Sequence, residues 1–208
     1  MFLIGLTGSI GMGKSATGRM FASRGIPVHD ADAQVHELYQ AEAVAPIREA
    51  FPAAVVETGV DRERLSQIVV GDRAALRRLE AIVHPLVRAR ERRFLDRCFA
   101  AGHRHVVLEV PLLFETGGDR RVDAVVVTSA PADVQRRRVL ARGGMTEAKL
   151  EAILARQLPD RDKRRRAHFI VDTGRSFAFA EKQVDDILRA IAACPGNAYR
   201  RGAPISDG

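Results

Sequence analysis

The chain has 208 residues, of which 46% are hydrophobic and 28% are charged. This balance is typical of a folded globular protein and argues against a disordered or membrane-spanning one. No apolar run approaches the roughly 20 residues that cross a bilayer, and residues 1–4 lack the basic start of a signal peptide. Cys98 and Cys194 have neither zinc-ligand nor disulfide spacing. We expect a cytoplasmic single-domain protein, and its net charge of +7 admits nucleic acid or small phosphorylated molecules as partners.

Short apolar segments predict the strands of a parallel sheet. Most are continuously apolar, as strands covered on both faces are, and helical patterns lie between them, so the fold class is α/β. The last strand leads into a helix with Ser176 as its expected N-cap. Its apolar stripe comprises Phe177, Ala180, Val184, Ile187, Leu188 and Ile191. The predicted strands are residues 2–6, 26–28, 106–110, 122–128 and 169–171.

Two helical stretches are longer than the connections of a simple sheet require. Residues 33–101 contain several helical segments and no convincing strand, which predicts a helical insertion. Residues 132–166 are rich in arginine and are broken by Gly143-Gly144, which predicts a mobile lid. The core then comprises residues 1–32, 102–131 and 167–194, and we expect the tail at 195–208 to be frayed.

Residues 8–15 read Gly-Ser-Ile-Gly-Met-Gly-Lys-Ser, between an apolar strand and a helix that runs to about Ser23. This is the pattern and the context of a phosphate-binding P-loop. Lys14 is expected to reach the β- and γ-phosphates of ATP, and the Ser15 hydroxyl to bind Mg²⁺. The alternative is a glycine-rich turn before an ordinary helix. Such a turn needs neither the preceding apolar strand nor the Gly-Lys-Ser ending. The expected nucleotide-binding residues are Gly8, Gly11, Met12, Gly13, Lys14, Ser15 and Ala16.

Asp30-Ala31-Asp32 follows the second predicted strand, and a helix is expected to begin near Ala33. Because the carboxyl ends of parallel strands form the ligand crevice, Asp32 is expected near the P-loop. A carboxylate there can accept the proton of an acceptor hydroxyl or align that hydroxyl for attack. The alternative is that Asp32 only caps the helix.

Several motifs occur in a fixed order along nearly the whole chain. They are residues 5–15, Asp30-Ala31-Asp32, His84-Pro85-Leu86, Pro111-Leu112-Leu113-Phe114-Glu115, and the series Arg138, Arg142 and Gln157. On these motifs the chain resembles the dephospho-coenzyme A kinase family. The resemblance implies a P-loop nucleoside-kinase-like three-layer fold, with a five-stranded parallel sheet, a helical acceptor-binding insertion and a helical lid.

The resemblance also implies an activity, the phosphorylation of the ribose 3′-hydroxyl of dephospho-coenzyme A by ATP with Mg²⁺. The products are coenzyme A and ADP, in the last step of coenzyme A synthesis. Asp32 would activate or orient the hydroxyl. Two alternatives stay open: His84 as a structural contact before a proline-started helix, and Leu112, Leu113 and Phe114 as plain core. The substrate-binding residues implied are Asp32, His84, Pro85, Pro111, Leu112 and Leu113.

Arg138 and Arg142 are the expected catalytic arginines of the lid. Guanidinium groups on a closing lid stabilise the charge of a moving phosphoryl group and exclude water. Their spacing of four predicts one helix face, with Gly143-Gly144 as the hinge. Arg136 and Arg137 are expected to be solvated or to attract phosphate. The run at 161–166 is expected to be a solvated, partly disordered basic face.

The chain departs from the family pattern at two places that bear on the site. Val171-Asp172-Thr173 stands where the family has Ile-x-Asn, so the resemblance gives no expectation for adenine contacts there. Glu109 stands where family members often carry Asp or an apolar residue, and a contact to Mg²⁺ through water is one interpretation.

Two rival functions share part of this pattern. Another small-molecule P-loop kinase would have the P-loop without the accompanying motifs. A nucleic-acid-binding protein or nucleotide switch would explain the positive charge, but no known binding module and no Asn-Lys-x-Asp motif occurs. We therefore expect a small-molecule substrate, no nucleic-acid or membrane partner, and a monomer or small homo-oligomer.

Overall fold

The computed structural model describes residues 1–201. The chain divides into two compact units, and unit 2 is the continuous segment Asp30–Arg97. Unit 1 combines Met1–His29 with the chain from Cys98 onward. No helix within residues 1–201 combines the length and the apolar character that a membrane span requires.

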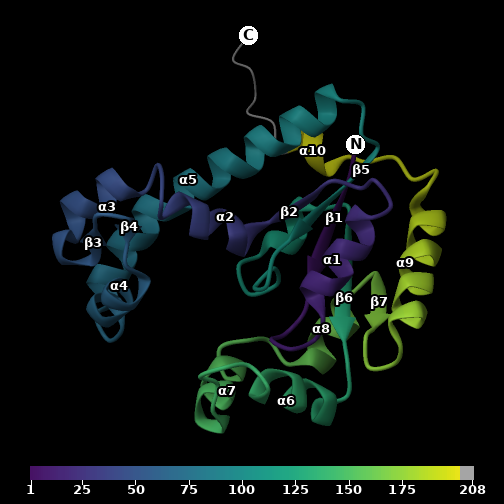
Figure 1. The fold of residues 1–208 in the computed structure, drawn as a ribbon. Helices are drawn as coiled ribbons and strands as arrows, with labels where there is room; N and C mark the ends of the chain where they lie inside the picture. Colours follow the sequence, from purple (N-terminus) through teal and green to yellow (C-terminus); the bar gives the residue numbers. More distant parts are fainter. Residues whose placement is uncertain (202–208) are drawn as a thin grey trace. The chain divides into compact units, whose positions relative to one another are not determined.

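Unit 1 is built on a five-stranded sheet with the strand order β2-β5-β1-β6-β7 (Figure 1). The pairings of β1 with β5 and β6, and of β6 with β7, are parallel, and Ile4 of the central strand lies between Val107 and Ala124. Every residue of β1 and β6 is buried, as expected for strands covered on both faces. A strand occurs at each of the five predicted places, although the second and the fourth each begin two residues later than predicted: β1 (Phe2–Thr7), β2 (Val28–Asp30), β5 (His105–Glu109), β6 (Ala124–Ser129) and β7 (Phe169–Asp172).

Helices cover the sheet of unit 1 through apolar stripes. In Figure 1, α9 runs alongside β7, and its buried stripe of Ala180, Val184, Ile187 and Ile191 packs into the same core as β1 and β6. Ser176 caps α9 as predicted. The helices of unit 1 are α1 (Lys14–Ala22), α6 (Ala132–Leu140), α7 (Glu147–Leu154), α8 (Asp160–Arg166), α9 (Phe177–Ile191) and α10 (Ala198–Arg201), with a 3-10 turn at Gly118–Arg121.

Three predictions about unit 1 are wrong. Phe177 does not belong to the buried stripe, because as the first residue of α9 its side chain is 70% exposed. The run at 161–166 is not partly disordered, since it forms α8, and Lys163 is completely buried, although Arg161, Arg164, Arg165 and Arg166 are exposed as predicted. Residues 195–201 are not frayed, because the Asp123 carboxylate accepts the backbone N–H groups of Asn197 and Ala198. The rest of the expected tail, 202–208, lies outside the described residues.

Unit 2 has a core of its own, which includes Leu38, Ile47, Phe51, Leu65 and Leu79. The prediction of no strand here is wrong in one detail, a two-residue antiparallel pair that is too short to produce an alternating pattern. Its elements are α2 (Ala31–Leu38), α3 (Val44–Ala50), a 3-10 turn (Pro52–Ala54), β3 (Val55–Val56), β4 (Gly59–Val60), α4 (Arg62–Val69) and α5 (Arg73–Ala100), whose last residues belong to unit 1.

Candidate active site

The P-loop joins the carboxyl end of β1 to α1, and glycine is required at three of its positions. Gly11 and Gly13 have φ values of 77° and 84°, which side-chain-bearing residues rarely adopt. Gly8 is packed so tightly against Thr128 that a Cβ atom would overlap the threonine hydroxyl. The loop therefore curls over the amino end of α1, where backbone N–H groups and the helix dipole favour an anion.

Lys14 and Ser15 converge on a single buried carboxylate. The Nζ atom of Lys14 lies 2.7 Å from Oε1 of Glu109, and the Ser15 hydroxyl donates to the same oxygen at 2.9 Å. Glu109 is the last residue of β5 and is 3% exposed. Gly18 of α1 makes room for it, because a Cβ atom there would overlap Oε2 of Glu109. A buried acid at the end of an otherwise apolar strand is the sequence signal that marks Glu109 as a site residue.

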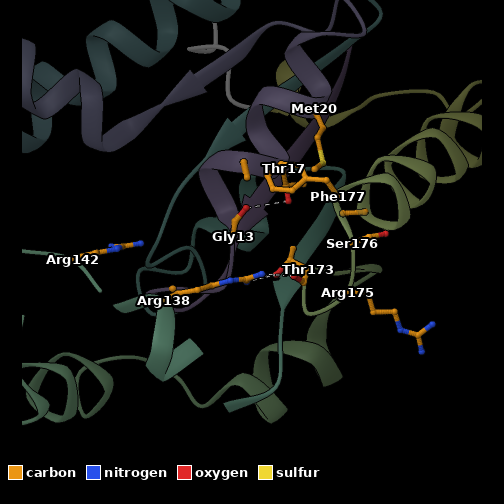
Figure 2. A pocket seen from close by; sticks show the side chains of 12 residues that line it. Gly13, Thr17, Met20, Arg138, Arg142, Thr173, Arg175, Ser176 and Phe177 are labelled. Carbon is orange, nitrogen blue, oxygen red and sulfur yellow. Dashed lines mark hydrogen bonds between the residues drawn. The ribbon is translucent and has the colours of Figure 1, made fainter. Parts of the chain in front are cut away.

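A cavity of about 280 Å³ lies beside the P-loop, entirely within unit 1 (Figure 2). Its lining is contributed by the P-loop and α1, by the end of α6, and by the segment from β7 into α9. Figure 2 shows Arg138 reaching Thr173, whereas the Arg175 side chain points away. The lining residues are Gly11, Gly13, Ala16, Thr17, Met20, Arg138, Arg142, Thr173, Arg175, Ser176, Phe177 and Ala180.

Arg138 and Arg142 line the same cavity, but the prediction that they share a helix face is wrong. The helix α6 ends at Leu140, and the Arg142 N–H donates to the carbonyl of Val139, in a tightened turn before Gly143-Gly144. Arg138 donates to the carbonyl of Thr173 at 2.6 Å and to its hydroxyl at 3.1 Å. That hydroxyl in turn donates to the carbonyl of Met12 at 2.9 Å. Arg138 is thereby coupled to the P-loop.

The two arginines next to Arg138 take part in surface ion pairs. Arg136 pairs with Glu147 and Glu151 of α7, and Arg137 pairs with Asp133 one turn earlier. Their side chains are half or more exposed, which agrees with the prediction of solvated charge.

Three of the predicted site residues, Asp32, His84 and Pro85, belong to unit 2. Asp32 is exposed in the first turn of α2, and the helix cap is Asp30, whose Oδ1 accepts the N–H groups of Asp32 and Ala33. The alternative that Asp32 is the cap is therefore wrong. His84 and Pro85 are exposed within α5, so the alternative of a helix that begins at Pro85 is also wrong.

The segment Pro111–Glu115, which follows β5, is divided between surface and core. Leu113 and Phe114 are 1% and 6% exposed, so the core interpretation holds for these two, and the expected substrate contact of Leu113 is corrected to a packing role. Leu112 is 39% exposed. The carbonyl of Pro111 accepts hydrogen bonds from the Thr7 hydroxyl at 3.1 Å and from Lys163 at 3.3 Å.

The site combines a P-loop at the end of the central strand with a buried carboxylate on the neighbouring strand. Two arginines lie across a cavity from the loop. This combination is typical of a P-loop kinase. A solved structure shares the fold. The shikimate kinase of Bacteroides thetaiotaomicron has a TM-score of 0.50 at 18% identity, over 92% of this chain and 98% of that one, which is a likeness of fold alone.

The family model of dephospho-CoA kinase matches residues 2–178, and the chain belongs to this family. It is 58% identical to the dephospho-CoA kinase of Mesorhizobium japonicum, over 95% of this chain and all of that protein. It is 54% identical to that of Rhodopseudomonas palustris strain HaA2, over 94% and 98% of the two chains. The crystal structure of TT1252 from Thermus thermophilus, 34% identical, has a TM-score of 0.81 over 91% of this chain and 97% of that one.

The predicted family, fold class and enzyme class are therefore confirmed. The family catalyses the last step of coenzyme A biosynthesis with ATP as the phosphate donor.

Proposed function

We propose that this chain transfers the γ-phosphate of ATP to the ribose 3′-hydroxyl of dephospho-coenzyme A, giving coenzyme A and ADP. The observation that carries the proposal is the convergence of Lys14 and Ser15 on buried Glu109 at the mouth of the P-loop, in a chain of this family. In the nucleotide complex, Lys14 would exchange its contact to Glu109 for the β- and γ-phosphate oxygens. Gly8, Gly11, Met12 and Gly13 would enclose those phosphates with backbone N–H groups.

The cavity beside the P-loop is the proposed adenine site. Met20 and Ala180 supply apolar surface, and Ala16 lines it next to the loop. The exposed ring of Phe177 belongs to the same lining, and an exposed aromatic ring is a stacking platform for a base. Thr173, which stands where the family pattern has asparagine, holds Arg138 and the P-loop instead of presenting a side-chain amide.

The Ser15 hydroxyl and the Glu109 carboxylate supply the kind of donor that Mg²⁺ prefers, hard oxygen atoms. Within residues 1–201 no cluster of three or more His, Cys, Asp or Glu side chains could hold a metal. In the proposal, the phosphate oxygens of ATP supply most of the ligands of the ion. When bound, Mg²⁺ would neutralise charge on the phosphates. Ser15 and Glu109 are the residues proposed to hold it, Glu109 through water.

Arg138 and Arg142 are the proposed catalytic arginines. Both line the cavity next to the P-loop, and guanidinium groups there stabilise the charge of the moving phosphoryl group. Gly143-Gly144 supports a hinge for the proposed lid at 132–166, because Gly144 has a φ of 73° and a Cβ atom at either glycine would meet only open space.

Unit 2 is the proposed acceptor-binding part, with Asp32 as the carboxylate that accepts or orients the 3′-hydroxyl. Asp32 is exposed, and the cap of α2 is Asp30. His84 and Pro85 are proposed to contact the acceptor. Pro111 and Leu112 are proposed acceptor contacts on the ground of the family resemblance. A cytoplasmic site of action remains part of the proposal, because ATP is available there. A monomer or small homo-oligomer also remains part of it.

A coupled assay of ADP release, with dephospho-coenzyme A, adenosine and shikimate offered separately, tests the proposal. We expect turnover with dephospho-coenzyme A only. Turnover of adenosine or shikimate without that of dephospho-coenzyme A would overturn it.

A further inference from the structure

Ile10, in the middle of the P-loop, is held by two glutamine side chains. Its N–H donates to Oε1 of Gln157 at 3.1 Å, and its carbonyl accepts from Nε2 of Gln135 at 2.7 Å. Gln135 lies on α6 and is 7% exposed, and Gln157 lies in the turn between α7 and α8. The two glutamines thus come from the two ends of the segment proposed as the lid.

These two hydrogen bonds fix the peptide planes on both sides of the Ile10 Cα atom. The N–H of Ile10 belongs to the peptide with Ser9, and its carbonyl belongs to the peptide with Gly11. Rotating either plane would break one bond and leave a polar group without its partner, which is costly away from water. Gly11 is also confined, because a Cβ atom there would lie 3.1 Å from the carbonyl of Gln135.

The orientation of these peptides decides what the loop presents to a phosphate. A P-loop binds anions because its N–H groups point inward and its carbonyl groups point away. Gln135 keeps the carbonyl of Ile10 turned toward α6, and a flipped peptide would place a negative oxygen dipole among the N–H groups. The carbonyl of Met12 is held outward in a similar way by the hydroxyl of Thr173.

We propose that Gln135 and Gln157 are positioning residues, which hold the two Ile10 peptides and so set the affinity of the P-loop for the phosphates of a nucleotide. The inference rests on the proposed function only in requiring that the P-loop binds ATP. Neither glutamine touches the cavity proposed for adenine. Their removal should therefore weaken phosphate binding and leave binding of the nucleoside part unchanged.

Titration calorimetry with ADP and with adenosine measures the two parts separately. Gln135→Met and Gln157→Met keep the length of the side chain and remove the hydrogen bond. We expect each to raise the Kd of ADP about 3- to 10-fold and to leave the Kd of adenosine unchanged. An equal loss for adenosine would mean general damage to the site and would overturn the proposal.

The two glutamate variants give a charge-matched comparison. Gln157→Glu retains an acceptor for the Ile10 N–H, whereas Gln135→Glu removes the donor and places a carboxylate against a carbonyl. Both add one negative charge near the same residue, so we expect Gln135→Glu to weaken ADP binding several-fold more than Gln157→Glu. Equal losses in the two variants would contradict the assigned hydrogen bonds.

Ser129→Ala is the matched control. It tests whether a general loosening of the proposed lid at 132–166 is enough to weaken ADP binding. It removes a 2.8 Å hydrogen bond to Asp160 of α8 without touching the P-loop. We expect its ADP affinity to match that of the parent protein, and a loss as large as that of Gln135→Met would overturn the proposal. ADP binding needs no acceptor, so failure of the proposed phosphoryl transfer to dephospho-coenzyme A would leave these results interpretable.

Discussion

The Nζ atom of Lys163 lies 2.9 Å from Oε1 of Glu115, and no part of the Lys163 side chain is exposed. The same carboxylate oxygen accepts the backbone N–H of Leu158 at 2.7 Å, and Lys163 also donates to the carbonyl of Pro111. Arg166 of α8 adds a contact, since its guanidinium lies 4.4 Å from the centre of the Phe114 ring. One carboxylate and one ammonium therefore hold α8 against the segment that follows β5.

We expect Glu115→Gln to lower the free energy of unfolding by about 3 kcal/mol or more, because it leaves the ammonium of Lys163 buried without a counter-charge. Urea denaturation monitored by circular dichroism measures the change. Asp133→Asn is the control, since its pair with Arg137 is largely exposed and should contribute at most about 1 kcal/mol. Equal effects of the two substitutions would contradict a stabilising role for the counter-charge of the buried Lys163 ammonium.

The same pair predicts a pH dependence of stability. Burial acts to raise the pKa of Glu115, but the hydrogen bonds from the Leu158 N–H and from Lys163 outweigh it and hold this pKa below its ordinary value of 4.5. A depressed pKa stabilises the fold above the unfolded value, and this contribution is lost as the pH falls through the folded value. We expect the stability advantage over the double variant Glu115→Gln, Lys163→Met to shrink between about pH 5 and pH 3. A pH-independent difference in unfolding free energy would refute this expectation.

Glu109→Gln tests the proposed metal contact. The substitution keeps the shape of the side chain but removes the negative charge that faces Lys14 and Ser15. We expect the Mg²⁺ concentration for half-maximal activity to rise about 10-fold or more, as for other residues that support a metal indirectly. The control Glu181→Gln removes an equal charge from an exposed position of α9 and should leave the Mg²⁺ dependence unchanged.

Phe177→Ala should weaken the binding of ATP without affecting that of dephospho-coenzyme A. Because Phe177 is 70% exposed, its loss should leave the thermal unfolding midpoint nearly unchanged. Loss of base stacking is worth about 1–3 kcal/mol, so we expect the KM for ATP to rise about 5-fold or more while the KM for dephospho-coenzyme A stays the same. Phe99→Ala is the matched control, since Phe99 is also exposed and stacks on Tyr199. A rise in both KM values would argue against the adenine site.

Asp32→Asn should bind ATP normally and transfer phosphate slowly. The amide retains the size of the carboxylate but cannot accept the proton of the 3′-hydroxyl, and general-base contributions of this kind are typically 10²- to 10⁴-fold. The expected result is a fall in kcat of at least about 10²-fold with an unchanged Kd for ADP. Near-normal turnover would remove Asp32 from the catalytic residues.

Local signals in the sequence were enough to predict much of this protein. The continuous apolar runs predicted every strand of the main sheet, and the P-loop pattern predicted the turn into α1. Ser176 was a correct N-cap because capping depends on residues three positions apart. Each of these features is encoded within a few consecutive residues.

The features that sequence reasoning missed depend on contacts between distant segments. The sequence suggested a contact of Glu109 to Mg²⁺ but not its ion pair with Lys14, which lies 95 positions away. Lys163 lies in a run of charges that suggests exposure to solvent, and its burial is made favourable by contacts to Glu115 and to the carbonyl of Pro111, both far from it in sequence. Arg142 lies beyond a helix that ends two residues earlier than its charge pattern suggests. Helix ends and charge partners of this kind are set by tertiary packing, which no local window contains.

The central position of β1 has a consequence for synthesis of the chain. Its partners β5 and β6 begin to pair with it only at His105 and Ala124, about 100 residues after β1 itself. At about 5–20 residues per second, this strand waits for roughly 5–20 s on the ribosome. Unit 2, a continuous segment with its own core, is completed within that interval. During this interval β1 is an unpaired apolar strand, while unit 2 has already been synthesised in full. We therefore expect chaperones that recognise extended apolar segments to bind the nascent chain in this period.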